Sequence, residues 1–179
     1  MNILVLGGVR SGKSRYAEQI AGRDSVSVVL IVTATAGDEE MAARIAAHRA
    51  RRPAHWQVIE EPIELGRAIR RATSSGTVVI VDCLTLWLSN LLALENRNVI
   101  DAQRAALRSA VAESTGTLVL VSNEVGSGIV PASELGRRFR DEAGVLHQEL
   151  AQQCDQVVWM VAGLPVMVKA PGRPGAERA

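Results

Sequence analysis

The sequence predicts an α/β protein in which helices cover both faces of a mostly parallel sheet, a three-layer α/β/α arrangement. Short apolar runs alternate with segments of helical spacing along the chain, which is typical of strand–helix–strand units. The interior must also be aliphatic, because 47% of the 179 residues are hydrophobic and only 3% are aromatic. Aliphatic interiors are typical of parallel sheets that are buried on both faces. The length is that of one compact domain.

The individual elements follow from this alternation. Apolar runs predict strands at residues 3–6, 26–32, 78–81, 118–121 and 157–161. The segments between and after them predict helices at residues 15–21, 39–49, 63–72, 84–94, 102–113 and 135–153. No repeat or linker divides the chain, so we expect residues 1–169 to form a single domain. Residues 170–179 are rich in Pro and Gly, and we expect a poorly ordered tail there.

An eight-residue motif joins the first predicted strand to the first predicted helix. It matches the phosphate-binding pattern G-x-x-x-x-G-K-[ST] and consists of Gly7, Gly8, Val9, Arg10, Ser11, Gly12, Lys13 and Ser14. In such a loop the backbone amides surround phosphates, Lys13 reaches the β- and γ-phosphates, and Ser14 binds Mg²⁺. The positive end of the helix dipole adds to the attraction. Nucleotide binding is therefore the leading hypothesis, against the alternative of an ordinary glycine-containing turn.

Polar residues follow two later strands, at the edge where open parallel sheets bind ligands. Asp82 directly follows the strand predicted at 78–81, where an acidic residue of a phosphate-loop protein orients Mg²⁺ or its water. The alternative role for Asp82 is to cap the helix that starts at Leu84, and the two roles are compatible. Asn123 and Glu124 follow the strand predicted at 118–121. They face the nucleotide or the acceptor, or they only cap and turn the chain.

A histidine lies at the end of the helix predicted at 39–49. His48 extends an apolar stripe of that helix and precedes a basic segment, which consists of Arg49, Ala50, Arg51 and Arg52. The arginines suit phosphate binding, and their charges favour the neutral imidazole that a histidine nucleophile requires. From spacing alone, the alternatives are a partner of the helix dipole or a partly buried core residue. His55, in a loop after Pro53, is a second candidate nucleophile.

Three other residues are expected to be structural. His147 lies on the long amphipathic helix predicted at 135–153, where a surface or core-edge position is expected. Cys83 is expected to be a small buried hydrophobe rather than a reactive thiol. Trp87 belongs to an apolar stripe that packs on the sheet or forms part of an interface.

Charge and cysteine content limit the remaining classes of function. The formal net charge is +1, so no global basic field attracts nucleic acid. The two cysteines lie far apart in sequence and lack metal-ligand spacing. Because the sequence shows neither a signal peptide nor an apolar segment of membrane-spanning length, we expect a cytoplasmic protein with no membrane span.

Taken together, the motifs resemble one family. The residues that carry the resemblance, besides the loop motif and Arg15, are Glu40, Met41, Arg44, Ile45, His48, Arg52, Pro53, Trp56, the runs at 123–126 and 128–131, and Phe139, Arg140, Asp141 and Gly144. They resemble the bifunctional adenosylcobinamide kinase and adenosylcobinamide-phosphate guanylyltransferase family of cobalamin biosynthesis, over residues 2–169. The resemblance implies a P-loop NTPase fold with a RecA-like central sheet, and assembly as a homotrimer or another homo-oligomer.

The resemblance also implies two reactions and a set of site residues. ATP or GTP, with Mg²⁺, phosphorylates adenosylcobinamide at the phosphate loop. His48 then takes GMP from GTP and passes it to adenosylcobinamide phosphate, which gives adenosyl-GDP-cobinamide and pyrophosphate. The nucleotide contacts implied outside the loop are Thr33, Ala34, Thr35, Arg49, Ala50, Arg51, Arg52, Glu60 and Asp82. Ala47 stands where some members have a second histidine, so any role of that neighbour is absent here.

Two hypotheses from other classes stay open at this point. One is a monofunctional phosphotransferase that uses only the loop and Asp82. The other is a RecA-like nucleotide-gated binding module without transfer chemistry. A covalent histidine–GMP adduct separates all three possibilities. The arginines that flank His48, and the absence of a basic or aromatic nucleic-acid surface in the sequence, argue against the binding module.

Overall fold

The computed structural model describes residues 1–23, 27–35, 53 and 55–170, and these form a sheet of seven strands. The strands are β1 (Asn2–Gly7), β2 (Ser27–Val32), β3 (Gln57–Glu60), β4 (Thr77–Asp82), β5 (Thr117–Asn123), β6 (Gln156–Val161) and β7 (Leu164–Lys169). Their order is β3-β2-β4-β5-β1-β6-β7. All neighbours are parallel except β6 and β7, which confirms the predicted mostly parallel sheet.

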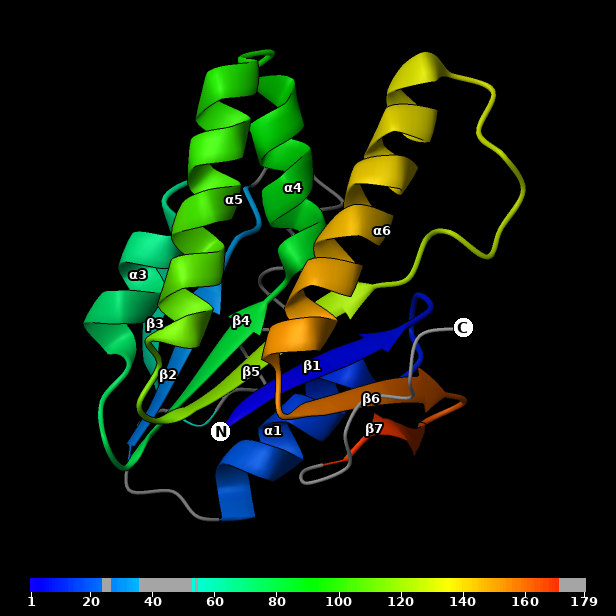
Figure 1. Ribbon diagram of the computed structural model, residues 1–179. Helices are drawn as coiled ribbons and strands as arrows, with labels where there is room; N and C mark the ends of the chain where they lie inside the picture. The colour runs from blue at the N-terminus through cyan, green and yellow to red at the C-terminus, as the bar shows by residue number, and fades with distance from the viewer. Residues whose placement is uncertain (24–26, 36–52, 54, 171–179) are drawn as a thin grey trace.

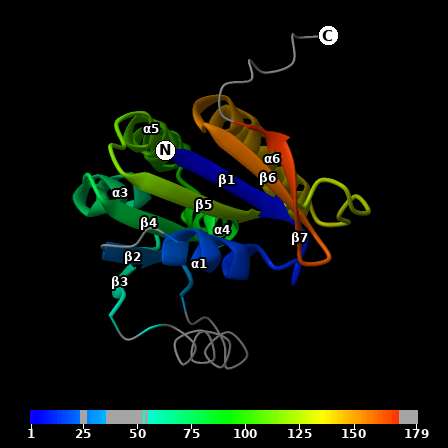
Figure 2. The ribbon, with the colours of Figure 1, turned by 90° about the horizontal axis from the view of Figure 1, so that it is seen from below.

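Helices cover both faces of this sheet (Figures 1 and 2). One face carries α1 (Lys13–Arg23), and the other carries α3 (Leu65–Ala72), α4 (Leu84–Ala93), α5 (Arg97–Ala112) and α6 (Glu134–Gln153). The side chains of β1 alternate between the two layers, with Leu4 and Leu6 on the α3–α6 side and Ile3 and Val5 on the α1 side. All four are buried, so the strand is apolar throughout, as expected for the middle layer of three.

Most of the predicted elements are present with small shifts at their ends. The helix predicted at 102–113 begins earlier, at Arg97, because the Asn96 side chain accepts a hydrogen bond from Val99 N and caps it. The helix predicted at 39–49 lies outside the described residues, as does almost all of the predicted tail. Cys83 and the Trp87 stripe of α4 are buried, and Trp87 Nε1 donates to Ile63 O. That stripe is therefore core and not an interface.

Two strands were not predicted, and both lie at an edge of the sheet. β3 has only four residues and most of its side chains are exposed, so it has no apolar run to signal it. β7 contains Pro165 and follows β6 through a tight turn at Ala162 and Gly163, whose φ angles are 50° and 84°. An Ala-Gly pair is a weak hairpin signal, and proline is tolerated in a strand only near an edge.

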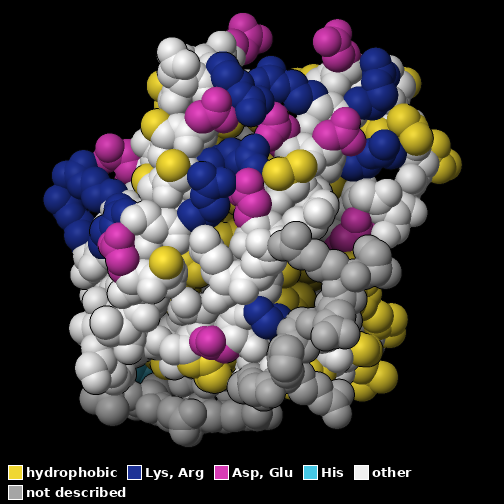
Figure 3. Space-filling view, in the orientation of Figure 1, with side chains coloured by type: hydrophobic (Ala, Val, Ile, Leu, Met, Phe, Trp, Pro, Cys, Tyr) yellow, Lys and Arg dark blue, Asp and Glu magenta, His cyan; other side chains and the backbone are white. Residues whose placement is uncertain are grey.

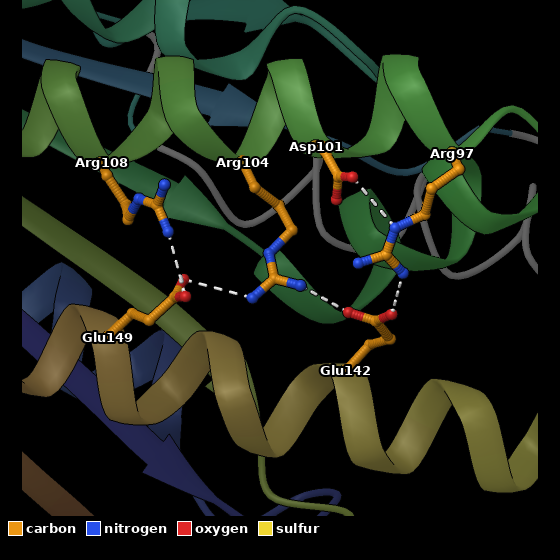
Figure 4. Close-up of polar contacts among 6 residues, drawn as sticks. All are labelled: Arg97, Asp101, Arg104, Arg108, Glu142 and Glu149. Carbon is orange, nitrogen blue, oxygen red and sulfur yellow. Dashed lines mark hydrogen bonds and ion pairs between the residues drawn. The ribbon is translucent and has the colours of Figure 1, made fainter.

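A ladder of ion pairs fastens α5 to α6 (Figure 4). Arg104 lies in the middle and bonds both Glu142 and Glu149, while Arg97 also bonds Glu142 and Arg108 also bonds Glu149. The Arg104 side chain is only 8% exposed, whereas that of Arg97 is 56% exposed. Over the helices in Figure 3, acidic side chains lie among the basic ones. No described helix has the length and apolar character of a membrane span.

The ladder predicts that Arg104 stabilises the fold far more than its neighbour. Arg104→Met leaves two partly buried carboxylates without their shared cation, and we expect a loss of about 3 kcal/mol in the free energy of unfolding, measured by urea denaturation. Arg97→Met is the matched control, because it removes an exposed partner of the same Glu142. If both variants lost the same free energy of unfolding, the buried position of Arg104 would not be what makes it more stabilising than Arg97.

Candidate nucleotide site at the carboxyl edge of the sheet

The phosphate-binding motif forms the connection between β1 and α1, as predicted. The backbone takes positive φ at Gly7 (151°), Arg10 (57°) and Gly12 (98°). A Cβ at Gly7 would lie 2.6 Å from Met160 O, and one at Gly12 would lie 3.2 Å from Gly163 Cα. Glycine is therefore required at both positions, for space as well as for conformation. Gly163 N donates to Ser11 O at 3.0 Å, so the β6–β7 turn supports the loop from one side.

Lys13 points back into the loop that it follows. Its side chain is buried, and Nζ donates to Gly8 O at 2.6 Å. Burial lowers the pKa of Lys13, while the nearby Asp82 and Cys83 act in the opposite direction. Lys13 is also the first residue of α1, so its charge and the positive end of the helix dipole lie at the same place. This arrangement suits an anion such as phosphate.

Ser14 and Asp82 meet beside the loop. Ser14 Oγ donates to Asp82 Oδ2 at 3.0 Å, which brings the first turn of α1 to the end of β4. The N-cap of α4 is Cys83, so the alternative in which Asp82 caps this helix is wrong. A hydroxyl and a carboxylate are oxygen donors of the kind that Mg²⁺ uses, with substrate phosphates and water completing its shell. These two residues therefore fit the metal that the motif implies.

The ends of β2 and β3 lie at the same edge. Thr33 is buried, and its hydroxyl donates to Cys83 O at 2.7 Å and accepts from Cys83 N at 3.0 Å. Its side chain thus holds the turn from β4 to α4. The sequence did not predict this structural role for Thr33. Ala34 is half-buried and Thr35 is exposed. Glu60 ends β3 opposite Val32, so the structure brings it close to the 33–35 segment.

The histidine and the basic segment expected to take part in guanylyl transfer are not covered by the structure. His48, Arg49, Ala50, Arg51 and Arg52 all lie outside the described residues. His55 is described and is exposed, in the turn before β3.

The end of β5 lies against the loop. Gly7 pairs with Asn123 in the ladder, and Glu124 N donates to Gly7 O at 3.0 Å. The Glu124 carboxylate accepts from the backbone amides of Gly126 and Ser127, so it does turn the chain. Burial would raise the pKa of Glu124, but hydrogen bonds with the Ser127 side chain and with these backbone amides lower it overall, together with the nearby His147.

His147 also belongs to this edge, which sequence spacing did not indicate. Its Nε2 lies 2.7 Å from Ser122 Oγ, although the two residues are 25 positions apart. Burial lowers the pKa of His147, and the Glu124 carboxylate opposes this effect. Ser122 directly precedes the predicted Asn123, but only the packing of α6 on the sheet reveals its partner.

The loop, Lys13 and the Ser14–Asp82 pair define a nucleotide-binding protein of the P-loop class. Solved structures support the fold. A RadB recombinase superposes with a TM-score of 0.58 at 17% identity, covering 97% of this chain and 83% of the other. An ATPase from the type III secretion system of pathogenic bacteria gives 0.56 at 12% identity, covering 88% of this chain and 50% of the other. The predicted RecA-like three-layer fold is confirmed.

Sequence comparison identifies the family within this class. The family model for cobinamide kinase / cobinamide phosphate guanyltransferase matches residues 3–168. The bifunctional adenosylcobalamin biosynthesis protein CobP of Pseudomonas aeruginosa is 52% identical over 169 residues, which cover 94% of this chain and 98% of the relative. The corresponding CobU of Escherichia coli K12 is 41% identical over 184 residues, covering 94% and 100%. The chain belongs to this family and is a bifunctional enzyme of adenosylcobalamin biosynthesis.

The close contacts of the loop predict different outcomes for two adjacent glycines. Gly7→Ala places a methyl group against Met160 O at a positive φ angle, and we expect it to destabilise the protein by about 2 kcal/mol or more. Gly8→Ala is the matched control, since nothing lies within 4 Å of its Cβ position. Thermal unfolding without nucleotide measures the difference, and similar melting temperatures for both variants would refute it.

Proposed function

We propose that the phosphate-binding loop is the kinase site of this enzyme and that His48 carries GMP in the guanylyl transfer. The proposal of a kinase site rests on the contact between Ser14 Oγ and Asp82 Oδ2, which lie 3.0 Å apart. This pair lies beside Lys13, whose Nζ is bonded inside the glycine-bounded loop. This arrangement suits phosphoryl transfer, in which a protein mainly positions groups and stabilises charge.

In the kinase step the hydroxyl of the aminopropanol arm of adenosylcobinamide attacks the γ-phosphorus of ATP or GTP. The bond from the γ-phosphorus to the β–γ bridging oxygen breaks, ADP or GDP leaves, and the attacking hydroxyl loses its proton. Lys13 and the loop amides stabilise negative charge on the phosphate oxygens. Mg²⁺ bound by Ser14 and Asp82 would neutralise further charge on the β- and γ-phosphates.

In the guanylyl step His48 attacks the α-phosphorus of GTP and pyrophosphate leaves. The resulting phosphorus–nitrogen bond holds GMP until a phosphate oxygen of adenosylcobinamide phosphate displaces it. The covalent intermediate divides one difficult transfer into two displacements at the same phosphorus, each of which has a lower barrier. The neighbouring Arg49, Arg51 and Arg52 supply positive charge for the triphosphate, and the 33–35 segment with Glu60 supplies contacts to the GTP that donates the guanylyl group. The cytoplasm, where both nucleotides are available, is the proposed location.

We further propose that the enzyme is a homotrimer or another homo-oligomer that uses the β7 edge of the sheet. β7 presents exposed apolar side chains, namely Leu164 (69%), Val166 (51%) and Val168 (64%). None of the described residues covers this edge, and an exposed apolar edge strand is prone to associate with another chain. A second copy of the chain, as in the family that the sequence resembles, is the occupant proposed here.

The histidine mechanism predicts a covalent adduct on one residue. Wild-type protein incubated with Mg²⁺ and GTP labelled at the α-phosphate is expected to retain label after denaturation, with the stability in base and lability in acid of a phosphoramidate. His48→Ala should lose the label but keep the kinase activity, because the loop is intact. His55→Ala should behave as wild type. Label that survives in His48→Ala would rule out this nucleophile.

Asp82→Asn provides the reciprocal test of the kinase site. It is expected to lower the rate of adenosylcobinamide phosphorylation about 100-fold and to raise the Mg²⁺ concentration needed for half-maximal rate. An unchanged dependence on Mg²⁺ would exclude Asp82 from the metal site.

If the protein is an oligomer, its mass in solution is a multiple of the 19.1 kDa of one chain. For the trimer it is three times that value. Val168→Glu places a charge on the β7 surface and is expected to reduce the mass measured by light scattering to that of one chain. Val145→Glu, at a 46% exposed position on α6, is the matched control. A wild-type protein of single-chain mass would exclude the proposed assembly.

A further inference from the structure

A row of polar groups crosses from α6 to the end of β5 and on to α4. His147 Nε2 lies 2.7 Å from Ser122 Oγ, and Ser122 Oγ lies 3.2 Å from Thr85 Oγ1. Thr85 Oγ1 in turn accepts a hydrogen bond from Asn123 N at 2.7 Å. We call these three side chains, His147, Ser122 and Thr85, the relay. The relay joins three elements through hydrogen bonds that a displacement of any one element would break.

The relay lies between the two halves of the kinase site. β5 is the strand between β4 and β1, so its end at Asn123 falls between Asp82 and the start of the phosphate-binding loop. On one side Asn123 pairs with Gly7 in the sheet. On the other side its backbone N–H donates to the hydroxyl of Thr85, in the first turn of α4. The next residue, Glu124, donates its backbone N–H to Gly7 O. The relay therefore sets how Asn123 faces the loop.

The middle residue of the relay is buried, so it acts indirectly. Ser122 is 1% exposed, so its hydroxyl does not reach a substrate, and its hydrogen bonds are made inside the protein. These distances fit one arrangement of protons along the relay. Thr85 accepts from Asn123 N and donates to Ser122, and Ser122 donates to the unprotonated Nε2 of a neutral His147. Removing the imidazole would leave a buried hydroxyl proton without an acceptor, which favours a shifted Ser122 and Asn123.

We propose that His147 is a positioning residue for phosphoryl transfer, which acts through Ser122 and Thr85 to hold Asn123 where its side-chain amide contacts the γ-phosphate. This inference rests on the proposed kinase site in the phosphate-binding loop. A side-chain amide supplies a neutral N–H donor at a point where charge builds up during the transfer. Misplacement of such a donor by a fraction of an ångström lowers the rate of the chemical step more than it weakens nucleotide binding.

The test compares variants of the full-length enzyme in the kinase reaction with ATP and adenosylcobinamide. His147→Leu is expected to lower kcat about 30-fold while the KM for ATP changes less than about threefold. His147→Gln should recover most of the rate, because its amide can accept the Ser122 hydrogen bond. Asn123→Ala should lower kcat similarly, and His147→Leu should have no further effect when added to it. Gln148→Leu, at an exposed position of the same helix, is the control for a new apolar residue on α6.

Several results would overturn the proposal. These are an unchanged kcat in folded His147→Leu, no recovery in His147→Gln, or losses that multiply in the double variant. If His147→Leu does not fold, Ser122→Ala breaks the relay with a minimal change in packing, and an unchanged kcat in that variant has the same meaning. Failure of the proposed kinase site itself looks different, because Lys13→Ala and Asp82→Asn would then also leave phosphorylation unchanged.

Discussion

The close approach of three backbone segments at the phosphate-binding loop constrains the rest of the structure. Gly7 lies against Met160 O of β6 and is bonded to Glu124 N beyond β5, and Gly12 lies against Gly163 of the β6–β7 turn. Side chains would keep these segments apart, so glycine is required where they meet. β1 must accordingly lie between β5 and β6, and β5 in turn separates it from β4 and Asp82. The centre of the sheet is thus arranged around the loop.

The sequence predicts those parts of the fold that short stretches of chain encode. The five apolar runs became strands because each is long enough to be buried on both faces, and the loop motif fixed its own place between β1 and α1. β3 and β7 escaped prediction because edge strands need not be apolar or free of proline. β3 forms by pairing with β2, which is distant in sequence. β7 forms by pairing with β6, to which a tight turn connects it.

The same division applies to the candidate site. Ser14 and Asp82 were predicted from the positions that they occupy after a strand or within a motif, and the structure brings them into contact. The partners of Thr33 and His147 could not be predicted, because Thr33 meets Cys83 only through the pairing of β2 with β4, and His147 meets Ser122 only through the packing of α6 on the sheet. The roles of His48 and the adjacent arginines stay predictions, since those residues lie outside the described part of the chain.

The two basic side-chain types are used differently. Arginine forms the α5–α6 ladder, where a planar guanidinium can bridge two carboxylates at once. Lysine occurs only twice in the sequence, and each ammonium binds backbone carbonyl oxygens: Lys13 at Gly8, and Lys169 at Ala151, Gln152 and Cys154. The α-amino group of Met1 is also bonded, to Gly116 O. Few amines are therefore available to acylating reagents. A phosphate that drew Lys13 away from Gly8 would change the reactivity of one of only three amino groups, which makes amine labelling a direct report on the state of the loop.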